Sequence, residues 1–126
     1  MPHCVLVVDD DLLVRWSLRQ ALAARGLQVL EAGSGKEALQ LAQEQRFAGA
    51  VIDWSLPDTD GLTLLAAIAL ACPGCRLLLL TAYVSEDLTA RALERGAAQV
   101  LGKPFEVDDI ASRVALEVHA STRMSP

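Results

Sequence analysis

Short apolar runs alternate along the chain with longer segments in which apolar residues recur every three or four positions. The short runs are typical of strands that are buried on both faces of a sheet. The longer segments have the period of a helix with one buried face. The predicted strands are residues 4–8, 27–30, 49–52, 77–80 and 98–101, and the predicted helices are residues 14–25, 34–42, 60–72, 86–95 and 106–119.

This alternation predicts an α/β fold, with a five-stranded parallel sheet and helices on both of its faces. The connections are short, and we find no internal repeat, low-complexity segment or interior linker. Residues 1–119 are therefore expected to form one domain. Residues 120–126 are expected to be a C-terminal tail or the start of a linker.

Local signals mark the starts of several helices. Ser34, with Glu37 three residues later, has the spacing of a capping box. Asp11 is expected to cap the first helix, because its side chain can accept a hydrogen bond from the first turn. Asp58 and Asp60 are interpreted in the same way, as turn and cap residues rather than as members of a site.

The 126 residues carry a formal net charge of −5 and are 52% hydrophobic. An acidic domain lacks the basic surface that binds nucleic acid phosphates, so direct nucleic acid binding is not expected. The longest apolar stretch, residues 62–72, is too short to span a bilayer, and no polybasic segment or signal-peptide pattern is recognised. Three cysteines do not indicate an extracellular disulfide framework. We therefore expect a cytoplasmic protein without membrane contact.

Polar residues that can handle phosphate follow four of the five predicted strands. Because ligands bind outside the carboxyl ends of parallel strands, these residues are expected to meet at one edge of the sheet. They are Asp9, Asp10 and Asp11 after the first strand, Asp53 after the third, Thr81 after the fourth and Lys103 after the fifth. Clustered carboxylates require a cation, and an all-oxygen ligand set suits Mg²⁺. With an ammonium and a hydroxyl group beside them, they indicate Mg²⁺-dependent phosphoryl transfer onto a carboxylate.

Four motifs, in this order, resemble those of response-regulator receiver domains in two-component signalling systems. They are residues 5–10, Asp53 with residues 56–61, residues 81–82 and residues 103–105, and the resemblance covers nearly the whole chain. It implies a flavodoxin-like receiver fold with strand order 2-1-3-4-5. That order leaves the second strand at an edge of the sheet, so Glu31 is expected to lie outside the cluster.

The resemblance also implies roles for single residues. Asp53 would be the phosphoacceptor, Thr81 and Lys103 would contact the phosphoryl group, and the Lys103–Pro104 peptide bond would be cis. The implied Mg²⁺ ligands are Asp9 (through water), Asp10, Asp53 and the backbone carbonyl of Ser55. Such a domain would promote only its own phosphorylation and dephosphorylation, and would not act as an enzyme on other substrates.

The implied phosphodonor is the phosphohistidine of a histidine kinase or of a phosphotransfer protein. Output would pass to an effector domain or output protein through the fourth helix, fifth strand and fifth helix, residues 86–119. A homodimer is a further partner that the resemblance allows. Trp16 lies opposite the apolar stripe of its helix. It is interpreted either as a partly buried ring or as a contact for the kinase, which meets this helix in the family. His3 and His119 lie at the two ends and are not expected to donate the phosphoryl group.

Two other functions are weighed against phosphorylation. A pseudo-receiver, an interaction module that is never phosphorylated, is supported by Val100, which stands where many receivers carry a switching Tyr or Phe. A phosphatase of the haloacid dehalogenase type also uses an aspartyl nucleophile, but that family has a second Asp where Ser55 stands here. Cys72 and Cys75 flank a Pro-Gly pair, and a turn with Cys72 in the core is favoured over a redox or zinc site.

Overall fold

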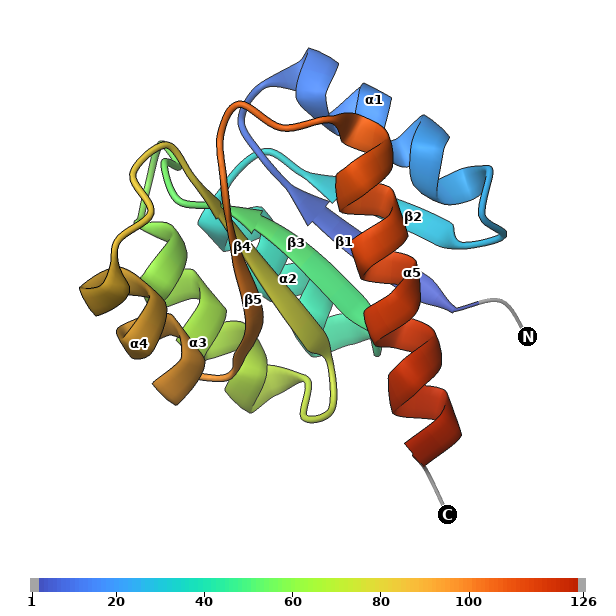
Figure 1. The fold of residues 1–126 in the computed structure, drawn as a ribbon. Helices are drawn as coiled ribbons and strands as arrows, with labels where there is room; N and C mark the ends of the chain where they lie inside the picture. Colours follow the sequence, from blue (N-terminus) through green and yellow to red (C-terminus); the bar gives the residue numbers. More distant parts are fainter. Residues whose placement is uncertain (1–2, 125–126) are drawn as a thin grey trace.

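The computed structural model describes residues 3–124, which form one parallel sheet with helices on both faces (Figure 1). The strands are β1 (Cys4–Val8), β2 (Gln28–Ala32), β3 (Gly49–Asp53), β4 (Arg76–Thr81) and β5 (Ala97–Gly102). The helices are α1 (Leu12–Ala23), α2 (Gly35–Glu44), α3 (Gly61–Ala71), α4 (Glu86–Glu94) and α5 (Val107–Met124). The strand order is β2-β1-β3-β4-β5, which confirms the predicted α/β class and topology.

Two hydrophobic cores lie on the two faces of the sheet, because successive side chains of a strand point to opposite sides. In β1, Leu6 and Val8 belong to the core beneath α2, α3 and α4, whereas Val5 and Val7 belong to the core beneath α1 and α5. Figure 1 shows the same division, with α1 and α5 on one side of the sheet. The strands are therefore covered on both faces, which explains their continuous apolar sequences.

The central strands β3 and β4 are the most deeply buried. All five residues of β3 are buried, and residues 77–80 of β4 are at most 1% exposed. Both strands also extend one residue further than predicted, to Asp53 and Thr81. Backbone pairing continues there, since the Trp54 N–H donates to the Leu80 carbonyl at 2.7 Å. Strand pairing depends on backbone groups, so a polar side chain at the end of the strand does not interrupt it.

The predicted caps are confirmed at three helices. The side chains of Asp11, Ser34 and Asp60 accept hydrogen bonds from backbone N–H groups in the first turns of α1, α2 and α3. Each cap satisfies a backbone donor that has no partner within the helix.

Several other predicted boundaries were wrong. The first helix was predicted at residues 14–25, but α1 begins and ends two residues earlier. The second strand was predicted at residues 27–30, but β2 pairs with β1 from Gln28 to Ala32. The last helix was predicted to end at His119, but α5 continues to Met124, because no glycine or proline interrupts the segment before that residue. The boundary between the domain and a tail or linker stays a prediction. No helix within residues 3–124 is long and apolar enough to cross a membrane.

Asp58 has a longer-range role than a local turn residue. Its two carboxylate oxygens accept the N–H groups of Gly35 (2.8 Å) and Lys36 (2.9 Å). These two bonds lower the pKa of the Asp58 carboxyl below its ordinary value. The loop after β3 is thereby tied to the start of α2.

Gly61 is required by close packing between the start of α3 and the end of β3. A methyl group placed on it would lie 2.7 Å from the carbonyl oxygen of Asp53 and 2.8 Å from the Cα of Trp54. Gly-to-Ala changes normally favour a helix, but here the backbone would have to shift. We expect Gly61→Ala to lower the free energy of unfolding by about 1–3 kcal/mol, as overpacking does, measured by urea denaturation.

Leu70 in the same helix provides the control, because its side chain is 85% exposed. Leu70→Ala should change the free energy of unfolding by less than about 0.5 kcal/mol. A Gly61→Ala protein as stable as wild type would contradict the close-packing argument.

Candidate functional site

The carboxyl ends of four strands meet at one edge of the sheet and bring four polar residues together. Asp9 follows β1, Asp53 and Thr81 end β3 and β4, and Lys103 follows β5. Because β1, β3, β4 and β5 are neighbours in a parallel sheet, their ends converge there (Figure 1). The sequence-based grouping of these residues therefore agrees with their placement in the fold.

Three carboxylates form the centre of this site. One oxygen from each of Asp9, Asp10 and Asp53 lies within 4.8 Å of the others. Asp9 and Asp53 are 2% and 3% exposed, whereas Asp10 is exposed. Like charges this close repel each other, and burial strengthens the repulsion.

Lys103 provides the positive charge of the site. Its Nζ lies 2.5 Å from Asp53 Oδ1 and 3.9 Å from Asp9 Oδ2. Burial by itself lowers the pKa of Lys103, but the bond to Asp53 and the surrounding carboxylates outweigh burial and hold that pKa above its ordinary value. Its backbone N–H also donates to the Thr81 carbonyl at 2.8 Å, and the Lys103–Pro104 bond is cis, as the resemblance implied.

Asp9 is only partly satisfied by protein groups. Its Oδ1 accepts the Asp11 N–H at 2.9 Å, but its Oδ2 has no hydrogen-bond partner, alone among the buried oxygen and nitrogen atoms of the described side chains. Burial raises the pKa of the Asp9 carboxyl, and the charge of Asp53 adds to this, although the Asp11 N–H and Lys103 oppose it. An oxygen-rich cluster with an unpartnered buried oxygen fits a hard divalent cation.

Thr81 ends β4, the strand that pairs with β3, and Ser55 lies two residues after Asp53 in the loop that follows β3. Thr81 is buried, and its Oγ1 accepts the backbone N–H of Tyr83 at 3.2 Å. Ser55 is exposed and pairs with Asp60 across the loop after β3 in an isolated antiparallel bridge. The roles of both residues toward a phosphoryl group or a metal stay predictions.

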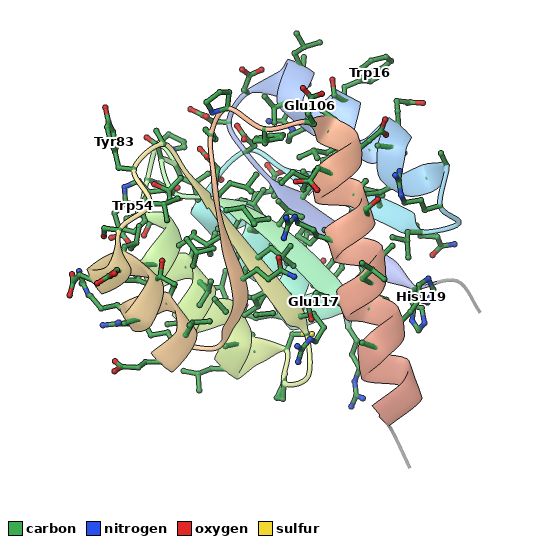
Figure 2. The ribbon with its side chains drawn as sticks, viewed as in Figure 1. Trp16, Trp54, Tyr83, Glu106, Glu117 and His119 are labelled. Carbon is green, nitrogen blue, oxygen red and sulfur yellow. The ribbon has the colours of Figure 1, made fainter. Side chains whose placement is uncertain are left out.

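Val100, which stands at the position of the family's switching ring, and the aromatic Tyr83 lie in different environments. Val100 is half-buried and packs against the core beneath α2, α3 and α4. Tyr83 is 84% exposed, and Figure 2 shows it projecting from the molecule. Neither therefore places an aromatic ring beside Thr81 within the core.

Sequence reasoning missed Arg15, which contacts the site from α1. Its guanidinium donates to the Asp9 backbone carbonyl at 2.7 Å and pairs with Glu31 Oε1 at 3.2 Å. Glu31 lies outside the acidic cluster, as expected, but it is connected to it through Arg15. Arg15 follows the Asp11 cap by about one helical turn, which is the only local signal that its side chain can reach back to the loop.

The other residues singled out in the sequence lie elsewhere. Cys72 is in the core, where its thiol bonds to the backbone of Phe47, and burial raises the pKa of the Cys75 thiol. The turn between them is confirmed by the Cys75 N–H bond to the Cys72 carbonyl. His3 and His119 stack edge to face, with ring centroids 5.9 Å apart, and His119 lies far along α5 (Figure 2).

The response regulator receiver domain family matches residues 5–115, and the chain belongs to this family. It is 33% identical to the transcriptional regulatory protein PdtaR of Mycobacterium tuberculosis over 94% of this chain and 58% of that protein. A CheY-like receiver domain protein from Methanospirillum hungatei shares the fold with a TM-score of 0.91, 27% identity and 98% coverage of both chains.

A response regulator from Burkholderia pseudomallei was solved with a phosphorylated aspartic acid and a calcium ion. It matches with a TM-score of 0.82 and 30% identity, over 98% of this chain and 73% of that one. The chain is thus a response regulator receiver domain of the kind found in two-component signalling. It spans little more than half the length of PdtaR.

The raised pKa of Asp9 has a consequence for stability. A carboxyl whose pKa is raised by folding binds its proton more tightly in the folded state, so stability is lost as the pH rises through that pKa. We expect Asp9→Asn to have a higher free energy of unfolding than wild type in urea denaturation at pH 7 with a chelator.

Asp10→Asn is the matched control, because Asp10 belongs to the same cluster but is exposed. Asp10→Asn should raise the free energy of unfolding by less than Asp9→Asn does, since burial is the largest cause of the raised pKa of Asp9. Mg²⁺ should stabilise wild type more than Asp9→Asn. Equal gains in both variants would contradict burial as the dominant cause.

Proposed function

We propose that Asp53 accepts a phosphoryl group from the phosphohistidine of a histidine kinase or a phosphotransfer protein. The observation that carries this proposal is the buried Asp53 carboxylate, paired with Lys103 inside an acidic cluster. An Asp53 oxygen would attack the phosphorus, the nitrogen–phosphorus bond would break, and the electron pair would return to the histidine imidazole.

Mg²⁺ is the cation that the donor set fits. Asp10 and Asp53 would bind it directly, Asp9 would bind it through water, and the backbone carbonyl of Ser55 would complete the protein ligands. The unpartnered Asp9 Oδ2 supports this proposal, because a cation or its water would satisfy it. When bound, the metal neutralises charge on the phosphoryl oxygens.

Lys103 and Thr81 would contact the transferred group. Lys103 would exchange part of its contact with Asp53 for a phosphoryl oxygen and stabilise the added negative charge. The Thr81 oxygen already accepts the Tyr83 N–H, so its own hydroxyl proton is available for a phosphoryl oxygen. These residues act on the chain's own phosphorylation and dephosphorylation, and no other substrate is proposed.

The partner surfaces are proposed on two parts of the molecule. Leu12, Leu13 and Trp16 expose apolar side chains at the start of α1, beside the loop of Pro104 and Phe105, and this face would receive the phosphodonor protein. The face of α4, β5 and α5 would contact the effector domain or output protein, with homodimer formation as one form of that contact. We place this exchange in the cytoplasm.

Phosphorylation is tested by intact mass after incubation with acetyl phosphate and Mg²⁺. We expect one phosphoryl adduct on wild type, because Asp53 is the buried carboxylate in closest contact with Lys103. Asp53→Asn and a chelator should each abolish it. No adduct on a folded wild-type chain would favour the pseudo-receiver, and turnover of phosphomonoesters would favour a phosphatase.

Trp16→Ala separates donor docking from chemistry. The ring is 55% exposed on α1 and is not among the groups that bind the phosphoryl group. Phosphorylation by acetyl phosphate should be unchanged, whereas transfer from a kinase that phosphorylates wild type should slow by about tenfold or more, as for an interface tryptophan. Leu70→Ala, another exposed apolar truncation, should slow neither reaction. Equal slowing of both reactions by Trp16→Ala would contradict the docking role.

A further inference from the structure

Arg15 joins three segments behind the acidic cluster. It lies on α1, its NH1 donates to the backbone carbonyl of Asp9 at 2.7 Å, and its Nε pairs with Glu31 of β2 at 3.2 Å. Its side chain is 17% exposed. A methyl group on Gly33 would lie 3.1 Å from Arg15 NH1, so Gly33 leaves the space that the guanidinium occupies.

The carbonyl that Arg15 contacts belongs to the peptide joining Asp9 to Asp10. At the other side of this peptide, the Asp9 side chain accepts the Asp11 N–H at 2.9 Å. The Asp9 N–H donates to the Ala32 carbonyl, which ends the pairing of β1 with β2. The orientation of the peptide determines where the Asp10 side chain points, since the Asp10 N–Cα bond begins at it.

Arg15 shares its carboxylate partner with a second arginine of the same helix. Glu31 forms an ion pair with Arg15 through Oε1 and a second ion pair with Arg19 through Oε2, the latter at 3.0 Å. The three side chains keep one net positive charge, which Arg15 and Arg19 share, so charge alone does not distinguish the two arginines. The contribution of Arg15 is a fixed hydrogen bond, because the planar guanidinium can bond a carboxylate and a carbonyl at once.

We propose that Arg15 is a positioning residue that holds the Asp9–Asp10 peptide in the orientation required for Mg²⁺ binding; this inference rests on the proposed metal-dependent function. Without Arg15, the two acidic residues lose one of the bonds that order them. Mg²⁺ then has to order the loop as it binds, so its affinity falls. Residues that orient metal ligands typically contribute in this way.

Arg19 provides a matched control. It pairs with the same Glu31 carboxylate from the same helix, but its bonds do not include the Asp9 carbonyl. If Arg15 only contributed a salt bridge to stability, the two arginines would behave alike. If it positions the metal ligands, only Arg15 will affect Mg²⁺ affinity.

The experiment is a Mg²⁺ titration of the full chain, followed by the fluorescence of Trp54, which directly follows Asp53. Trp16→Phe is used as background, since Trp54 is then the single tryptophan. We expect Arg15→Ala to raise the Mg²⁺ dissociation constant by about tenfold or more. Arg19→Ala should stay within about twofold of the background protein, as for an exposed ion pair.

Arg15→Lys is a milder second variant, used in case Arg15→Ala does not fold. It keeps the charge and the aliphatic stem, but one ammonium group cannot reproduce the planar fork. Urea denaturation without metal reports folding, and a folded Arg15→Lys should bind Mg²⁺ more weakly than the background protein. At saturating Mg²⁺, phosphorylation by acetyl phosphate should return toward the background level in both Arg15 variants.

The outcomes separate the two proposals. Equal Mg²⁺ affinity in folded Arg15→Lys and the background protein would overturn the positioning role and leave the proposed function intact. Equal losses of Mg²⁺ affinity in Arg15→Ala and Arg19→Ala would also overturn the positioning role. A background protein that binds no Mg²⁺ would remove the metal site, and both proposals with it.

Discussion

The repulsion among three carboxylates at the end of a buried sheet is the constraint on which this structure depends. Asp9, Asp10 and Asp53 are held together by strands β1 and β3, and Lys103 is the cation that contacts them within the described residues. One ammonium group cannot neutralise three carboxylates. The remaining charge is a cost to folding that a bound cation would offset, so stability and metal binding are linked.

The rest of the fold keeps this unfavourable group together. Strands β3 and β4 are buried on both faces, so their ends have little freedom to separate. Lys103 is fixed from its backbone as well as its side chain, since its N–H bonds to the Thr81 carbonyl. Because Gly61 has no side chain, α3 approaches the end of β3 closely, and the Gly61 N–H donates to the Trp54 carbonyl. Apolar packing thus supplies the stability that the acidic site lacks.

The fold was largely predictable because its signals are local. A strand buried on both faces reads as a continuous apolar run, and caps such as Ser34 and Asp60 act within one turn. Strand ends were less predictable, because Asp53 and Thr81 are polar side chains on backbones that still pair. Grouping the site residues needed only the rule that parallel strands end at the same edge.

Arg15 and Asp58 could not be predicted in the same way. Arg15 bonds to Glu31, and Asp58 bonds to Gly35 and Lys36, across loops that bring distant segments together. Each residue has an ordinary local interpretation, as a polar position on a helix or in a turn. Its actual partner depends on how the elements pack, and the spacing of residues along a single sequence does not identify that partner.

These contacts make the two sides of the site unequal. On the side of β1 and β3, Arg15 and Asp58 tie the loops to neighbouring elements, and any rearrangement there must break those bonds. On the side of β4, residues 82–87 are all exposed, and the Tyr83 N–H bond to Thr81 is local. A change of charge at Asp53 would therefore meet less resistance beyond β4, toward α4, than around the acidic cluster. An exposed loop beside a fixed acidic centre can rearrange while that centre keeps its place.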